Sequence, residues 1–373
     1  MNFKGKEVNE MSKFRKLIFS LAAIAALVVF MVSLVGCPTK PTPATETAAE
    51  KTTLTVSTEE TTPSTEAGFK LADKIAERAK KGEQLVIRVV YHNTGIAFAM
   101  PIKLGVEAAA KEFGVDAQMT GPVEPSVEQQ VAIIEDLIAK EVDGLAISNV
   151  SAEALNPVIE RALDAGIPTV SFNSDASGSK RLAFYGQDLV QSGKTEADIL
   201  VEYMGTKGKV LIFSCDAAAA WSKDRETGVR DGLGKYPDIE IVGIVNTGVE
   251  EQACYAAIES ALLANKDITG IAALDAVTTP AVGRYILRNN LAGKIIQVGH
   301  DLMPETLQNI KAGATNASIS QDPYKQGYLP VKAIFEYITK GVTLESADTG
   351  ALRVDEKNID EYLQKLEKGE PIG

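Results

Sequence analysis

The most constraining feature of the sequence is a regular alternation of short β-branched segments with longer amphipathic ones, beginning near Gln84. In the longer segments apolar residues recur at helical spacing, so that Ile102, Val106 and Phe113 share one helix face. Such alternation predicts an α/β fold, with parallel sheets covered by helices on both faces. The expected strands are Val86–Tyr91, Gly144–Ser148, Thr169–Phe172, Lys209–Ser214, Ile239–Val245, Gly270–Leu274, Ile295–Gly299 and Ala317–Ser320.

An internal repeat divides the alternating region into two halves. The run VDGLAISNVSAEALNPVIERALDAGIPTVSFNSD in the first half parallels ITGIAALDAVTTPAVGRYILRNNLAGKIIQVGHDLM in the second. We therefore expect two similar α/β domains, each with a parallel sheet flanked by helices. The repeat places Asn173 and His300-Asp301 at equivalent strand ends. If the two sheets face one another, both ends point into one cleft.

The stretch 167–188 is the first candidate for a binding site. It predicts a buried strand at 167–172, a polar tip at Asn173-Ser174-Asp175, a turn with Gly178 and a second strand at 182–186. Ligands of α/β proteins bind where strands end at their carboxyl side, so a polar tip here favours a site over a plain surface loop.

Composition narrows the function. The chain has 373 residues, 45% of them hydrophobic, and is long enough for two domains with separate cores. Its net charge is −12 and no basic stripe occurs, which argues against a nucleic-acid partner. Cys215 and Cys254 have no metal-ligand spacing, and only two histidines are present, so no metal site is expected. Two buried thiols and a disulfide between these cysteines both stay open.

The first 67 residues are expected to precede the folded body. A basic run at 13–16 and an apolar run at 17–34 predict an export signal over 1–36. The sequence Leu34-Val35-Gly36-Cys37 resembles the lipobox of bacterial lipoproteins, which implies acylation of Cys37; an uncleaved membrane anchor is the alternative, and either Met1 or Met11 serves as the start. Residues 37–67, rich in Thr, Pro and Glu, predict a disordered tether, and 68–82 a short helix.

Motifs of enzymes and nucleotide-binding proteins are missing. There is no G-x-G-x-x-G, no H-E-x-x-H and no G-x-S-x-G. Ser192-Gly193-Lys194-Thr195 imitates the end of a P-loop, but the first glycine of that motif is replaced by Asp188. We therefore expect neither an enzyme nor a cofactor.

Polar and aromatic residues gather at the predicted strand ends and in the loops beyond them. Amides, carboxylates and a guanidinium suit the hydroxyls of a sugar or polyol, and aromatic rings suit its C–H faces. Each residue also has a structural alternative: Asp275 and Asp301 as helix caps, Arg225 in a surface ion pair, and the others as core, loop or turn residues. The candidate ligand-binding residues are His92, Phe98, Asn173, Ser174, Trp221, Arg225, Asp275, Asp301 and Gln321.

From about Gln84 to Gly341 the chain resembles the type I periplasmic binding proteins of bacterial sugar ABC transporters, the group with the ribose-, galactose- and xylose-binding proteins. The resemblance is carried by AFAMPIKLGVEAAAKEFGV, VEQQVAIIEDLIAKEVDGLAIS, ALNPVIERALDAGIPTVSFN, the R-x-x-G-V of Arg225–Val229, QVGHD and SISQDPYKQG. The segment GPVEPSVEQQV also resembles the rhamnose-binding branch and its relatives that bind a furanosyl signalling molecule.

The resemblance implies roles for several residues. Phe98 would stack on the sugar, Arg225 would bind ring and hydroxyl oxygens, and Asp275, Asp301 and Gln321 would contact hydroxyls. At Asn173-Ser174 the sequence departs from the family pattern, where many members carry Asp and often Arg. Both a carboxylate and a guanidinium are missing there, which leaves the ligand undetermined and disfavours a simple ribose binder.

The resemblance also implies three crossings between the domains, near 187–188, 321–323 and 341–344. The domains would comprise 84–187 with 322–342, and 188–321 with 343–373. The expected protein is a monomeric, extracytoplasmic, lipid-anchored solute receptor that closes on a monosaccharide or polyol and delivers it to an ABC permease. A sensor or chemotaxis component, and a binding protein for a nucleoside or furanosyl signal, are the alternatives.

Overall fold

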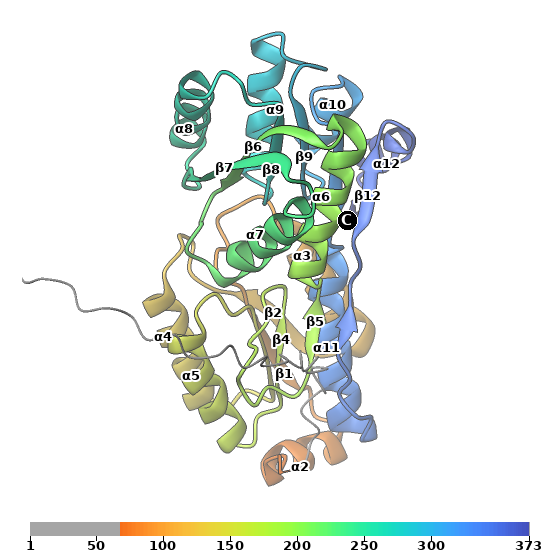
Figure 1. Cartoon of the computed structure of the whole chain (residues 1–373). Helices are drawn as coiled ribbons and strands as arrows, with labels where there is room; N and C mark the ends of the chain where they lie inside the picture. The colour runs from red at the N-terminus through yellow and green to blue at the C-terminus, as the bar shows by residue number, and fades with distance from the viewer. Residues whose placement is uncertain (1–67, 373) are drawn as a thin grey trace, which may run out of the picture. The chain divides into compact units, whose positions relative to one another are not determined.

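The computed structural model describes residues 68–372 (Figure 1). The expected export signal, Cys37 and the expected tether lie outside the described residues. The short helix expected within 68–82 is α2 (Asp73–Lys81), which ends at Gly82 in the left-handed conformation. Within the described range, no helix is long and apolar enough to cross a membrane.

The first sheet has six strands, all parallel, in the order β11-β5-β4-β3-β1-β2. Every residue of β3 and β4 is buried, as expected for strands that are covered by helices on both faces of the sheet. The sequence does not predict β2, whose residues DAQMT form an edge strand without an apolar run. The strands are β1 (Val86–Val90), β2 (Asp116–Thr120), β3 (Gly144–Ile147), β4 (Thr169–Phe172), β5 (Phe184–Gly186) and β11 (Ala347–Asp348).

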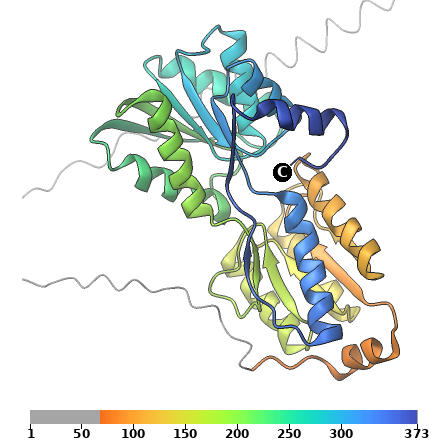
Figure 2. The ribbon, with the colours of Figure 1, turned by 90° about the vertical axis from the view of Figure 1, so that its right-hand side faces the viewer.

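Five helices pack with this sheet around one core, and together they form what we call the first lobe. Helix α11 lies alongside α3, and both figures show it against the first sheet (Figures 1 and 2). The close approach requires glycine: a Cβ at Gly105 would lie 2.0 Å from the carbonyl oxygen of Tyr324. The helices are α2, α3 (Ala99–Phe113), α4 (Val127–Ala139), α5 (Ala152–Asp164) and α11 (Pro323–Lys340).

The second sheet repeats the arrangement in the order β12-β10-β9-β8-β6-β7, with only β12 antiparallel to its neighbour. With its helices it forms the second lobe. Its strands are β6 (Lys207–Ser214), β7 (Asp238–Asn246), β8 (Gly270–Ala273), β9 (Ile296–His300), β10 (Ala317–Ser320) and β12 (Leu352–Asp355). Its helices are α6 (Leu189–Met204), α7 (Ala220–Leu233), α8 (Glu251–Ala264), α9 (Thr278–Arg288), α10 (Pro304–Lys311) and α12 (Ile359–Glu367).

The P-loop imitation lies inside helix α6. A Cβ at Gly193 would meet the carbonyl oxygen of Arg225 at 2.2 Å, and one at Gly228 would meet that of Val190 at 2.0 Å. These glycines let α6 and α7 pack with their backbones in contact, just as Gly105 does for α3 and α11. Gly193 is therefore a packing residue of a helix and not part of a phosphate loop.

The chain passes between the two sheets at three places. The first passage follows β5 at 187–188 and the second follows β10 at 321–322, both where the sequence predicts them. The third prediction, 341–344, is wrong. After α11 the chain adds β11 to the first sheet beside β5, and it reaches β12 of the second sheet only through 349–351. The segment 343–348 therefore belongs with the first lobe; a two-residue strand gives too short an apolar pattern to be found in the sequence.

Candidate functional site

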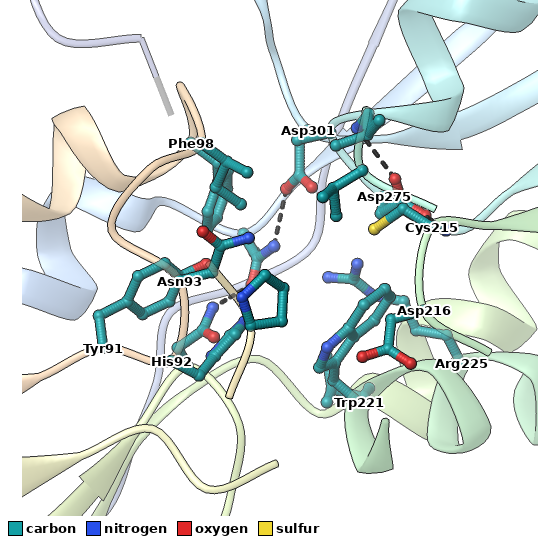
Figure 3. Close-up of a pocket in the computed structure, with 18 residues that line it drawn as sticks. Tyr91, His92, Asn93, Phe98, Cys215, Asp216, Trp221, Arg225, Asp275 and Asp301 are labelled. Carbon is teal, nitrogen blue, oxygen red and sulfur yellow. Dashed lines mark hydrogen bonds between the residues drawn. The ribbon is translucent and has the colours of Figure 1, made fainter. Parts of the chain in front are cut away.

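A cavity lies where the carboxyl ends of the strands of both sheets meet. It contains about 610 Å³ of empty space, part of which is open to solvent. Figure 3 shows side chains of the two lobes on opposite sides of it. The lining residues are Tyr91, His92, Asn93, Ile96, Phe98, Pro125, Asn173, Leu189, Cys215, Asp216, Trp221, Arg225, Val249, Asp275, Ala276, Val277, Asp301 and Gln321.

Eight of the nine predicted ligand-binding residues line this cavity, and Ser174 does not. The Ser174 hydroxyl instead donates to the carbonyl oxygen of Asn149, and the side chain is buried. Its neighbour Asp175 pairs with Arg181, away from the cavity. Of the tip Asn173-Ser174-Asp175, only Asn173 lines the cavity.

The first-lobe wall combines aromatic rings with amides. Phe98, at the start of α3, is buried and packs against Tyr91, with ring centroids 6.4 Å apart. Tyr91 in turn contacts the ring of His92, at 4.3 Å. The Tyr91 ring thus packs against the rings of both His92 and Phe98. Phe98 belongs to the first-lobe core and also lines the cavity.

His92 and Asn173 are joined through a buried serine. The Ser148 hydroxyl donates to Oδ1 of Asn173 at 3.1 Å and contacts Nδ1 of His92 at 2.9 Å. Because the Ser148 hydroxyl donates its one proton to Asn173, its oxygen must accept from His92, and the proton of the imidazole is therefore on Nδ1. Burial lowers the pKa of His92 to about 4, so the imidazole is neutral at neutral pH.

Two strand ends related by the repeat share an unusual backbone conformation. Asn173 after β4 and Asp301 after β9 are both left-handed, with φ of 60° and 72°. Asn and Asp tolerate this region better than other non-glycine residues, which accounts for the residue types. The turn aims each side chain into the cavity directly from the end of its strand.

Arg225 is the only basic side chain among the residues that line the cavity. It is 2% exposed on α7, so the alternative of a surface ion pair is wrong. Its Nη1 donates to the carbonyl oxygen of Leu274 at 2.7 Å, and Nη2 donates to Oε1 of Gln187 at 3.1 Å. Its Nε is buried without a hydrogen-bond partner. Leu274 and Gln187 thus hold the guanidinium in place, and the N–H group of Nε stays available as a donor.

The two cavity aspartates have different roles in the fold. Asp275 accepts from the backbone N–H groups of Val277 and Thr278 at the start of α9 and from that of Cys215, so the capping alternative is correct for it. Asp301 does not cap α10, whose N-cap is Met303 and which has no side-chain cap hydrogen bond. It accepts from Nε2 of Gln321 at 2.7 Å instead. Burial outweighs the neighbouring Arg225 and raises the pKa of Asp301 to about 6.

Gln321 links the two walls. Its Oε1 accepts from Nδ2 of Asn173 at 3.4 Å, while its Nε2 donates to Asp301. The turn alternative also holds for this segment, because the next residue, Asp322, caps α11 by accepting from the N–H of Lys325. Trp221 on α7 packs partly against the second-lobe core and lines the cavity opposite Phe98 (Figure 3).

Several lining residues were not predicted. Tyr91 ends the first predicted strand, Asn93 follows His92, and Cys215 and Asp216 follow β6 directly. Their position just after a strand was the available signal. The strand pattern includes Tyr91 but does not show which way its side chain turns, and the cysteine spacing leaves Cys215 as either a buried thiol or a disulfide partner.

The histidine beside Asp301 is turned away from the cavity. His300 is fully buried, with Nε2 3.1 Å from Oε2 of Glu196 on α6. Burial raises the pKa of Glu196 well above its usual value and lowers the pKa of His300 well below its usual value. Cys215 and Cys254 are both buried and free, which decides against the disulfide.

Comparisons with known proteins agree with this architecture. Residues 86–341 match the model of the periplasmic binding protein domain. The xylose/arabinose-binding protein of Sulfolobus acidocaldarius is 28% identical, over 74% of this chain and 72% of that protein. The D-allose-binding periplasmic protein of Escherichia coli is 25% identical, over 66% of this chain and 83% of that protein.

A solved structure gives the same result for the fold. The solute-binding protein of an ABC transporter from Burkholderia graminis, in complex with D-arabinose, is 28% identical to this chain. It superimposes with a TM-score of 0.71 and covers 74% of this chain and 97% of its own. The chain therefore belongs to the periplasmic binding protein domain family. Its two helix-flanked, mostly parallel sheets are the type I architecture, and the family and these relatives are binding proteins, not enzymes.

Proposed function

We propose that this protein is an extracytoplasmic receptor that captures a monosaccharide or a related polyol in the cavity, closes on it and delivers it to an ABC permease. The observation that carries the proposal is the buried Arg225, with an unpartnered Nε, in a cavity that also holds an aromatic ring on each wall. The names of the xylose/arabinose- and D-allose-binding relatives support the same ligand class.

The chemistry of a sugar fits both kinds of group. Ring and hydroxyl oxygens accept from the guanidinium of Arg225, and hydroxyl groups donate to the carboxylate of Asp301. The rings of Phe98 and Trp221 offer apolar faces to the C–H surfaces of the sugar. Polar groups that a correct ligand satisfies stay unsatisfied with a wrong one, so the same residues supply selectivity.

Closure follows from the three passages between the sheets. Rotation of the lobes about 187–188, 321–322 and 349–351 moves Asn173 relative to Arg225 and changes the width of the cavity. A ligand that contacts both walls stabilises the closed arrangement. We propose that the protein acts as a monomer and that the closed form is what the permease recognises.

A thermal-shift panel of pentoses, hexoses, polyols and nucleosides tests the ligand class. A ligand at 100 times its dissociation constant stabilises the native state by about 2.7 kcal/mol, so a true ligand raises the melting temperature by several degrees. We expect the rise with a member of the first three classes. A response to nucleosides alone would contradict the sugar proposal and favour the nucleoside alternative.

We propose that Cys37 carries the lipid that holds the protein at the membrane. Cys37→Ala then releases the protein into the soluble fraction, which fractionation and mass spectrometry of the N-terminal peptide measure. The matched substitution Cys254→Ala, at a buried thiol of α8, leaves membrane attachment unchanged. If the Cys37→Ala protein stays attached, the uncleaved apolar segment is the anchor.

A further inference from the structure

Gln187 is a buried amide that lies behind the cavity. It follows β5 at the first passage between the sheets and is 1% exposed. Its side chain is not among the residues that line the cavity; it lines a separate groove, with Asp188 and Asp348. Gln187 therefore has no direct access to a ligand and can influence one only through other residues.

The Gln187 side chain joins all three passages to Arg225. Its Nε2 donates to the carbonyl oxygen of Ser320, next to the second passage, at 3.2 Å. The same Nε2 donates to the carbonyl oxygen of Gly350, within the third passage, at 2.9 Å. Its Oε1 accepts from Nη2 of Arg225 at 3.1 Å. One side chain at the first passage thus holds the other two and the guanidinium that lines the cavity.

A second buried glutamine repeats this arrangement for the other wall. Gln326 of α11 donates through Nε2 to the carbonyl oxygen of Gln321 at 3.0 Å and to the Thr349 hydroxyl at 3.1 Å. Its Oε1 accepts from Nδ2 of Asn173 at 3.0 Å. Each wall therefore has one cavity side chain whose amide or guanidinium donates to a glutamine, and each glutamine binds the second and third passages.

We infer that Gln187 is a positioning residue that couples occupancy of the cavity at Arg225 to the geometry of the three passages. The inference deepens the proposed function and rests on it for the identity of the occupant. A ligand oxygen that accepts from Arg225 fixes the guanidinium, and the Arg225–Gln187 hydrogen bond then fixes the amide. Nε2 of the same amide donates to the carbonyl oxygens of Ser320 and Gly350. Rotation at the passages must therefore either move Gln187 together with these carbonyl groups or break the hydrogen bonds.

Gln187→Met removes the amide and keeps the length of the side chain. Fluorescence titration of Trp221, the one tryptophan of the chain, with D-xylose, D-ribose, D-allose and D-arabinose measures the effect on affinity. We expect a loss of about tenfold, the size of one hydrogen bond to a charged group. In an Arg225→Met background the same substitution costs less than about twofold, because the donor to Gln187 is already gone. Additive losses, or an unchanged affinity, would overturn the inference.

A ligand-free measurement separates this inference from the proposed function. Acrylamide quenching of Trp221 reports how open the cavity is, and we expect Gln187→Met to change the quenching constant without any sugar present. Gln297→Met is the matched control, since Gln297 is also a fully buried glutamine but its side chain bonds to Thr279 and Thr315, away from the three passages. We expect the Gln297→Met variant to have a lower melting temperature but the same quenching constant and sugar affinity as the wild-type protein.

Two outcomes remain to be distinguished. If Gln187→Met does not fold, Gln187→Asn keeps an amide that is one methylene too short to reach both carbonyl oxygens and Arg225, and the same shift in quenching is expected. If the wild-type protein binds none of the sugars, the proposed function fails, while the quenching comparison still decides the role of Gln187. Equal quenching in the wild-type protein and both Gln187 variants would overturn the inference.

Discussion

The two walls of the cavity are built from equivalent strand ends but differ in charge. The first-lobe wall, with Tyr91, Phe98 and Asn173, carries no ionised side chain at neutral pH, because His92 there is neutral. The charged groups that line the cavity, Arg225 among them, all come from the second lobe. The two halves of the repeat therefore share the backbone geometry of these strand ends but differ in the side chains they carry. The first-lobe wall offers apolar contacts and neutral hydrogen bonds, and the second-lobe wall offers charge-assisted hydrogen bonds.

The walls also respond to pH in opposite directions. The pKa of His92 falls from 6.5 to about 4 on folding, so its contribution to stability is present above pH 6.5 and is lost as the pH falls toward 4. The pKa of Asp301 rises from 3.8 to about 6, so its contribution is present below pH 3.8 and is lost as the pH rises through 6. Between about pH 4 and pH 6, a rise in pH therefore increases the contribution of His92 to the free energy of unfolding and decreases that of Asp301.

The largest expected effect comes from removing the positive charge of the second-lobe wall. Arg225→Ala should weaken sugar binding by about 100-fold or more, because hydrogen bonds to charged groups contribute about 1.5–3 kcal/mol each. Isothermal titration calorimetry measures the loss. Arg230→Ala on the same helix, which removes an exposed pair with Glu226, is the control and should bind normally. If Arg225→Ala binds the sugar with wild-type affinity, Arg225 does not contact the ligand.

A smaller effect is expected from the negative charge of the same wall. Asp301→Asn should bind the sugar about tenfold more weakly at pH 7.5, because a charge-assisted hydrogen bond becomes a neutral one. In the wild-type protein affinity should fall below about pH 6 as the Asp301 carboxylate is protonated, and in the variant this dependence should disappear. The exposed substitution Asp238→Asn should leave the pH profile as it is. A variant that keeps the wild-type profile would show that another group titrates.

The smallest effect is expected from the aromatic residues, on which the walls are alike. Phe98→Leu and Trp221→Leu should each weaken binding about threefold to tenfold, since an aromatic contact adds about 0.5–1.5 kcal/mol beyond its area. Competition calorimetry against the wild-type ligand resolves losses of this size. Phe335→Leu, an aromatic of the first lobe that packs on Phe113 outside the cavity, should have no effect on affinity. A loss confined to Trp221→Leu would place the sugar against the charged wall alone.

Most of the fold, and most of the candidate site, follow from local patterns. Strands such as β3 and β4 are short, fully buried segments with large or β-branched residues, and the repeat identifies Asn173 and Asp301 as equivalent ends. The third passage between the sheets is displaced to 349–351, because β11 is held by pairing with β5 and not by a pattern of its own. Ser174 was wrongly included for a similar reason: its partner is the backbone of Asn149, which no local sequence pattern indicates.

The sequence by itself determined the two-sheet architecture, the strand ends that carry polar residues and the lack of enzymatic motifs, because periodicity and chain order control those features locally. Only the tertiary structure decided which side chains share the cavity, that Asp275 caps a helix while Asp301 does not, and that His300 faces Glu196. It also revealed Gln187 behind Arg225. These outcomes depend on hydrogen bonds between residues far apart in the chain, such as that from Gln187 to Gly350, and packing of the whole chain creates them.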